Sequence, residues 1–314
     1  MRIFLAGATG AVGRRLVPML IADGHEVVAM THTPAKADGL RAAGALPIVG
    51  DALDREAVLG AVIGAQPEVI VHQMTALAGA SDMRHFDRVF ATTNRLRTEG
   101  TAHLLEGARA AGTRRLVVQG YTGWPFARTG GPVKDEDAPL DDQPPHAQRA
   151  TLAAMREMES LVTDECAGVD GVVLRYGALY GPGTSLAADG EVTQLVRRRR
   201  LPVIGDGAGR WSFTHIDDAA GGVVAALAPG APAGVFAIVD DEPAATAEWI
   251  PELAAAVGAR PPRHVPAWVG RLAAGEAAAT MMTESRGASN ARARSVLGWA
   301  PRHPTWREGF RQAL

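Results

Sequence analysis

Short apolar runs alternate with amphipathic stretches along the chain as far as Val118. Runs of this kind are typical of strands that are buried on both faces of a parallel sheet. We expect strands at Ile3–Ala6, Val27–Met30, Leu46–Val49, Val69–Val71 and Leu116–Val118. Helical periodicity marks the segments between them, Val12–Ala22, Ala35–Ala43, Arg55–Ile63 and Arg84–Ala111. The alternation predicts an α/β fold with a doubly wound, Rossmann-like parallel sheet.

The pattern continues for two more elements and then becomes irregular. A helix is expected at Gln148–Glu165 and a buried strand at Gly171–Leu174, whereas residues 128–145 are rich in Gly, Pro and Asp and predict a long surface loop. Regular alternation ends after Gly181. We therefore expect a Rossmann-like domain over residues 1–177 and a smaller C-terminal substrate lobe over residues 178–314, partly interleaved with the first domain.

Three glycines lie between the first expected strand and the first expected helix. In that context glycines permit a tight turn, and they let the backbone approach a pyrophosphate held at the helix N-terminus. The loop therefore predicts a dinucleotide-binding site. The residues expected to hold the cofactor here are Gly7, Thr9, Gly10, Ala11, Val12 and Gly13.

The end of the second strand indicates which dinucleotide is bound. An acidic residue there would hold the ribose 2′-OH of NAD, whereas basic residues favour the 2′-phosphate of NADP. The chain has His32 and Lys36 in this region and no carboxylate before Asp38, and Arg14 follows the glycine loop. We expect NADP to be preferred over NAD. The alternative is that Arg14 and Lys36 are ordinary solvated charges.

Composition excludes several other classes of function. The 314 residues are 47% hydrophobic and 21% charged, with a net charge of −2 and a single cysteine, Cys166. Interspersed charges argue against nucleic acid as a partner, and no apolar stretch is long enough for a membrane span. The N-terminal residues lack a signal-peptide pattern. The histidines share no metal-ligand spacing, so no metal is expected. These features predict a cytoplasmic protein with a small-molecule substrate.

Several further segments resemble the extended short-chain dehydrogenase/reductase family, of the NAD-dependent epimerase/dehydratase type. They are "VGDALD", "VIVHQMTAL", "TTNRLRTEGTAHLLEGARAAGTRRLVV", "VVLRYGALYGPG", "RWSFTHIDDAAGGVVAAL" and "LGWAPRHPTWREGF". The resemblance implies that Asp51 and Ala52 lie beside the adenine, that His72 ends the strand facing the cofactor, and that Asn94 supports the active-site backbone. It also implies a homodimer, formed through residues 84–111 and 148–165.

The residues that perform catalysis in this family are missing. Aligning the helix near residue 160 with the family places Thr151 where a Tyr is expected and Met155 where a Lys is expected. None of the three tyrosines is followed by a Lys four residues later. A threonine hydroxyl is a far weaker acid than a phenol, and methionine supplies no cation. Thr151 nevertheless stays a candidate catalytic residue, because it takes the place of the family's Tyr.

Other side chains are candidates to replace the missing acid. Tyr121 and Thr122 follow the fifth strand, where the nicotinamide is expected. A phenol has a pKa of about 10 and needs a neighbouring cation or the charge of the cofactor to act near neutral pH. Thr122 would hydrogen-bond a substrate carbonyl. His72 and His146 are alternative proton carriers, because only histidine titrates near neutrality without perturbation. A structural role is the competing interpretation for each.

The substrate side is less defined. Tyr176 directly follows the sixth strand and is expected to form a pocket wall. The family resemblance implies that a basic residue, here Arg210, holds the diphosphate of a nucleotide sugar. Trp211 beside it, together with Trp124 and Trp268, indicates instead an apolar pocket for a small natural product.

These observations favour an NAD(P)-dependent oxidoreductase or epimerase-like enzyme that acts on a carbonyl or hydroxyl group. Two alternatives stay open. The first is a dinucleotide-binding regulatory protein that has lost turnover. The second is a non-redox enzyme that uses the cofactor structurally.

Overall fold

A computed structural model describes residues 1–77, 83–164, 166 and 168–313 of the chain. Its centre is a sheet of seven parallel strands in the order β12-β7-β5-β4-β1-β2-β3. The strands are β1 (Arg2–Ala6), β2 (Glu26–Thr31), β3 (Leu46–Val49), β4 (Val69–His72), β5 (Arg115–Tyr121), β7 (Asp170–Tyr176) and β12 (Gly234–Ile238). The six strands expected from the sequence are confirmed, and the doubly wound α/β fold with them.

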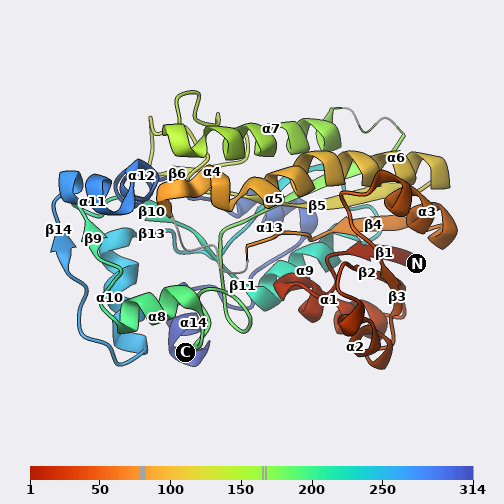
Figure 1. Cartoon of the computed structure of the whole chain (residues 1–314), viewed down its shortest axis with the longest axis horizontal. Helices are drawn as coiled ribbons and strands as arrows, with labels where there is room; N and C mark the ends of the chain where they lie inside the picture. Colours follow the sequence, from red (N-terminus) through yellow and green to blue (C-terminus); the bar gives the residue numbers. More distant parts are fainter. Residues whose placement is uncertain (78–82, 165, 167, 314) are drawn as a thin grey trace.

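Helices cover both faces of this sheet (Figure 1). One face packs against α1 (Ala11–Ala22), α9 (Ile216–Ala226) and α13 (Ala291–Leu297). The opposite face packs against α3 (Arg55–Ala65), α6 (Thr101–Ala111) and α7 (Arg149–Thr163). The inner strands β1, β2, β4, β5 and β7 therefore have side chains buried on both sides, which is why their apolar runs in the sequence are continuous, whereas the edge strand β3 leaves Leu46 and Val49 exposed. Residues 37–42 form α2 after the short 3₁₀ turn η1 (Pro34–Lys36).

The long helix expected at residues 84–111 is interrupted. It consists of η2 (Met83–His85), α4 (Phe86–Val89), α5 (Ala91–Arg95), a π-helical turn η3 (Leu96–Gly100) and α6. A π-turn widens the backbone and shifts the residues that follow it relative to an α-helix. The helix expected at 148–165 is also modified, because it starts with a 3₁₀ turn, η4 (His146–Gln148), and α7 ends at Thr163. Glu165, the end predicted for it, lies outside the described residues.

Short elements occupy most of the chain after β7. They are β8 (Ala178–Tyr180), α8 (Glu191–Arg197), β9 (Val203–Ile204), β10 (Arg210–Trp211), β11 (Phe213–His215), β13 (Ala244–Ala245), α10 (Thr246–Ala256), β14 (His264–Val265), α11 (Ala267–Ala274), α12 (Glu276–Thr283), β15 (Gly287–Ala288) and α14 (Trp306–Ala313). The predicted loop at 128–145 contains one short strand, β6 (Val133–Lys134), paired with β15. Strand β12 returns the chain to the central sheet, so residues after 178 contribute to both parts of the molecule.

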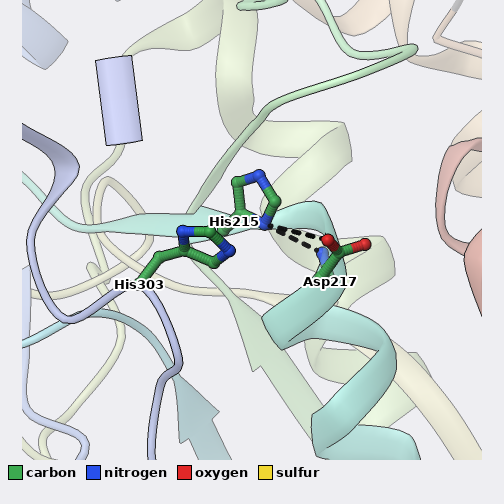
Figure 2. A group of neighbouring side chains, drawn as sticks. All are labelled: His215, Asp217 and His303. Atoms are coloured by element: carbon green, nitrogen blue, oxygen red, sulfur yellow. Dashed lines mark hydrogen bonds and ion pairs between the residues drawn. The ribbon is translucent and has the colours of Figure 1, made fainter. Parts of the chain in front are cut away.

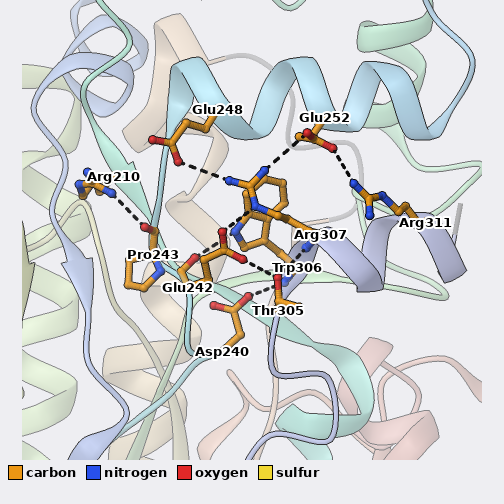
Figure 3. Close-up of polar contacts among 10 residues, drawn as sticks. All are labelled: Arg210, Asp240, Glu242, Pro243, Glu248, Glu252, Thr305, Trp306, Arg307 and Arg311. Atoms are coloured by element: carbon orange, nitrogen blue, oxygen red, sulfur yellow. Dashed lines mark hydrogen bonds and ion pairs between the residues drawn. The ribbon is translucent and has the colours of Figure 1, made fainter.

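The C-terminal segment is anchored by charges on α10 and the preceding loop (Figure 3). Arg307 forms ion pairs with Glu242 at 2.6 Å, Glu252 at 3.5 Å and Glu248 at 3.7 Å, and its guanidinium lies over the ring of Trp306. Trp306 is fully buried. None of the described helices is long and apolar enough to cross a membrane.

Candidate active site

The loop between β1 and α1 is so tightly built that two of its positions accept only glycine. Gly7 has a φ of +91°, and a Cβ atom there would lie 2.6 Å from the backbone of Gln73. A Cβ atom on Gly13 would lie 2.3 Å from the carbonyl oxygen of Gly7. Gly10, the N-cap of α1, gives the first turn at Ala11 no side-chain cap. A close, uncapped backbone of this kind is suited to a pyrophosphate, and the contact itself stays a prediction.

Hydroxyl and basic side chains, rather than carboxylates, surround the end of β2. Oγ1 of Thr31 lies 3.2 Å from Oγ1 of Thr9 and accepts the N–H of Thr33 at 3.2 Å. His32 and Lys36 follow, and both are exposed. A carboxylate at this position would bind the 2′-OH of NAD, and residues 31–36 contain none; the preference for NADP stays a prediction.

Asp51 and Ala52, expected beside the adenine, follow β3. Asp51 is exposed, and its Oδ1 accepts the N–H of Leu53 at 2.9 Å. Ala52 is buried, and its carbonyl oxygen lies 3.1 Å from Nδ1 of His103. The contact of these residues with an adenine stays a prediction.

His72, the last residue of β4, is buried with both ring nitrogens engaged. Nε2 lies 3.1 Å from the carbonyl oxygen of Leu96, and Nδ1 accepts the backbone N–H of Met74 at 3.1 Å. Burial lowers the pKa of His72 to about 4, so the ring is neutral at neutral pH. This geometry suits a residue that holds the surrounding backbone, and it does not suit the proton carrier considered for His72.

Two buried polar groups at the carboxyl ends of β4 and β5 lack a hydrogen-bond partner among the described residues. They are Nε2 of Gln73 and Oγ1 of Thr122. The backbone N–H of Thr122 donates to the carbonyl oxygen of Tyr176, which connects Thr122 to the end of β7. Other described groups are also unpaired, but these two lie at the carboxyl ends of parallel strands, where the ligands of such sheets bind, so we take them as candidates for ligand contact. Gln73 was not among the site residues expected from the sequence, although it lies in the segment "VIVHQMTAL" that carries the family resemblance.

Tyr176 does not form the pocket wall expected of it. The side chain is 1% exposed and belongs to the core beneath the sheet. Its hydroxyl lies 3.3 Å from Oε1 of Gln73 and 3.2 Å from the carbonyl oxygen of Ala219. Tyr176 therefore positions the amide of Gln73 rather than contacting a substrate.

The hydroxyl of Thr151 is fully committed to protein partners. It donates to Oδ1 of Asp87 at 2.7 Å and accepts from Nδ2 of Asn94 at 3.0 Å, and the Thr151 side chain is completely buried. Met155, one turn further on, is also buried. Asn94 thus supports the start of α7, whereas His146 is exposed just before that helix. The hydrogen bonds of Thr151 join α7 to α4 and α5, and they leave its hydroxyl unable to act as an acid toward a substrate.

Tyr121 stands at the end of β5 beside a buried cation that sequence analysis did not single out. The cation is Arg97, in the π-turn, which is 6% exposed. Burial raises the pKa of Tyr121 well above its ordinary value, and the charge of Arg97 partly offsets that rise. In the sequence Arg97 is one of many arginines, and nothing in the helical pattern distinguishes it from the exposed Arg95.

Aromatic side chains close the space in front of Tyr121 and Thr122. These two residues line a crevice of about 10 Å³ together with Trp124, Arg210 and Trp211. This volume holds about one water molecule, so a substrate must move side chains to enter. The guanidinium of Arg210 donates to the carbonyl oxygen of Pro243 at 3.1 Å (Figure 3). No described carboxylate forms an ion pair with Arg210.

Three potential metal ligands meet near α9, although no metal was expected from the sequence. Ligand atoms of His215, Asp217 and His303 lie within 4.8 Å of one another (Figure 2). Nδ1 of His215 already accepts the N–H of Asp217 and caps α9. The Asp217 carboxylate binds Arg15 through both oxygens. Burial and the neighbouring His303 lower the pKa of His215. Because two of the three ligands are already engaged, we assign no metal here.

The profile of the NAD dependent epimerase/dehydratase family matches residues 3–238. The chain belongs to this family. A "3-diazoavenalumate denitrifying reductase" from a Streptomyces species is 48% identical over 311 residues, covering 99% of both chains. Among solved structures, the Thermotoga maritima UDP-glucose 4-epimerase with UDP-glucose has a TM-score of 0.77 at 20% identity, over 100% of this chain and 97% of that one. A human epimerase family protein with NADPH has a TM-score of 0.75 at 22% identity, over 100% and 99%.

Membership of the epimerase/dehydratase family defines the class of chemistry. The chain is an enzyme, an NAD(P)-dependent oxidoreductase or epimerase of the extended short-chain dehydrogenase/reductase type. Its cofactor is a nicotinamide dinucleotide, which the glycine loop and the unpaired groups of Gln73 and Thr122 are suited to hold.

Proposed function

We propose that the chain is an NADPH-dependent reductase that removes the diazo group of an aromatic carboxylate and leaves hydrogen in its place. The support is a relative named for a denitrifying reduction of a diazo compound, to which this chain is similar over nearly its whole length. The site adds a chemical argument, because it is suited to a reduction that needs no proton donor.

The observation that carries the proposal is the committed hydroxyl of Thr151 next to the uncharged Met155. A ketone accepts hydride only if an acid supplies a proton to the developing alkoxide. An aromatic diazonium group is a cation and departs as neutral N₂. The C–N bond breaks, a C–H bond forms, and the hydride neutralises the positive charge, so no proton is consumed. A site without the usual acid is therefore sufficient for this substrate class.

The cofactor in this proposal is NADPH. When bound, its nicotinamide supplies the hydride. Gly7, Gly10 and Gly13 allow the backbone to meet the pyrophosphate, and His32 and Lys36 are available to a 2′-phosphate. The unpaired amide of Gln73 and hydroxyl of Thr122 gain partners in the occupied site.

The crevice supplies the substrate contacts. Arg210 makes one hydrogen bond to a backbone carbonyl, which leaves guanidinium donors for a carboxylate. Trp124 and Trp211 offer flat apolar surfaces to an aromatic ring. Tyr121 and Thr122 then lie toward the reacting end of the substrate.

The test is an assay of purified protein with NADPH and para-carboxybenzenediazonium, in which N₂ release and NADPH oxidation are followed together. We expect equal molar amounts of both, faster with NADPH than with NADH. Heat-denatured protein measures the uncatalysed background. NADPH oxidation only with a ketone, or conversion of UDP-glucose without net oxidation, would replace this proposal by a carbonyl reductase or an epimerase.

A further inference from the structure

Arg97 is a buried cation with almost no protein partner. Its side chain lies in the π-turn η3 and is 6% exposed. Its one hydrogen bond in the described part of the chain joins Nη1 to Oδ1 of Asn94 at 3.3 Å. A guanidinium carries five N–H donors, so most of its hydrogen-bonding capacity is unused.

The carboxylate that acts most strongly on Arg97 is already neutralised. Glu159 contributes to the electrostatic environment of Arg97, but both of its oxygens accept hydrogen bonds from Arg175 at 2.7 Å. No described carboxylate forms an ion pair with Arg97. Burial accordingly lowers the pKa of Arg97 to about 10, and the side chain stays charged at neutral pH.

An unpaired buried charge is costly to a protein and is normally compensated by an anion. The other groups around Arg97 do not supply one. His72 is neutral, Asn94 is an amide, and the Tyr121 hydroxyl makes no hydrogen bond with a described residue. Arg97 and Tyr121 interact electrostatically at the carboxyl end of β5, where Tyr121 faces the crevice.

We propose that Arg97 and the hydroxyl of Tyr121 form a binding site for an anionic oxygen on the substrate's aromatic ring, at the end opposite the carboxylate. This inference rests on the proposed function and extends it to the substrate class: a ring that carries a phenolate-type oxygen as well as the diazo group. Such an oxygen receives electron density when hydride arrives at the conjugated ring system. A cation and a hydroxyl placed beside it stabilise that charge in a site shielded from water.

The experiment uses para-nitrophenol, whose yellow phenolate reports its own ionisation and which undergoes no turnover. It is titrated against wild-type protein in the presence of NADP⁺. We expect the bound probe to ionise at lower pH than the free probe. Arg97→Met should weaken binding of the phenolate about tenfold and abolish the shift, because one charge-assisted contact is lost. Tyr121→Phe should reduce the shift. Arg95→Met, on the exposed neighbour, is the matched control and should leave it unchanged.

A second readout separates a binding role from a structural one. If Arg97 were structural, Arg97→Met would lower the melting temperature; as an unpaired charge, its removal should leave the melting temperature unchanged or raise it. Equal phenolate binding by wild type and Arg97→Met would overturn the inference. So would a shift abolished equally by Arg95→Met. Because the probe has no diazo group, a normal shift without diazo reduction would overturn the proposed function and leave the anion site standing.

Discussion

Two buried threonine hydroxyls in the site have opposite surroundings, and their roles follow from that difference. Thr151 donates to Asp87 and accepts from Asn94, so its hydroxyl is part of the fold. Thr122 is 2% exposed, and its hydroxyl has no partner among the described residues. Because Thr122 also lines the crevice beside Tyr121, we assign its hydroxyl to contact with a ligand, whereas the equally unpaired hydroxyl of Thr193 does not line that crevice.

Thr122→Val should therefore reduce kcat/KM by about tenfold or more without loss of stability, because the hydroxyl's only partner is the ligand. Melting temperature and steady-state kinetics with NADPH measure both effects. Thr193→Val is the matched control, since that hydroxyl is also buried and unpaired but lies in α8. Thr151→Val should instead unfold more easily, by about 1–3 kcal/mol. An unstable Thr122→Val protein with normal kcat/KM would contradict the assignment.

The sequence was informative about residues that meet the cofactor backbone and less so about the residues around the substrate. Gly7 and Gly13 were predictable because steric contact leaves no other residue type. Tyr176 looked like a pocket residue by position, yet it points into the core. Gln73 and Arg97 became candidates only when the structure showed what their polar atoms lack.

At the level of elements, the π-turn η3 is the feature that organises the site. It interrupts the helical repeat, so Leu96 and Arg97 are buried as consecutive residues. Nε2 of His72, at the end of β4, donates to the carbonyl oxygen of Leu96 and connects the turn to the sheet. Periodicity alone could not predict this, because a single widened turn leaves the apolar pattern on both sides of it helical.

This connection predicts that the protein loses stability as pH falls below neutrality. The pKa of His72 is about 4 in the folded state against 6.5 ordinarily, so below pH 6.5 the unfolded chain binds a proton first. The contribution of His72 is complete above pH 6.5 and is lost as pH falls toward 4. The loss of unfolding free energy between neutral pH and about pH 5 is about 2 kcal/mol.

Urea unfolding at neutral pH and at about pH 5 measures the effect. His72→Gln should remove this part of the pH dependence, and His146→Gln, at an exposed histidine, should keep it. If His72→Gln does not fold, an NMR titration of the His72 ring in the wild-type protein gives its pKa directly. A normal histidine pKa would contradict the description of β4 and η3.

For the whole molecule, the parallel sheet was predictable and the arrangement of the second half was not. Six strands follow from apolar runs bounded by helical segments. The seventh, β12, follows a stretch of short elements whose partners lie far away in sequence, so local patterning gives no register for it. The division at residue 177 and the homodimer stay predictions.

In the proposed reaction, this epimerase/dehydratase family member transfers hydride to a substrate carbon that loses N₂. The most direct measurement uses NADPH deuterated at the transferable position with para-carboxybenzenediazonium, followed by mass spectrometry of the benzoate product. We expect one deuterium at the ring carbon that carried nitrogen, in protein-dependent amounts. Product without deuterium, or deuterium incorporated equally with denatured protein, would contradict it.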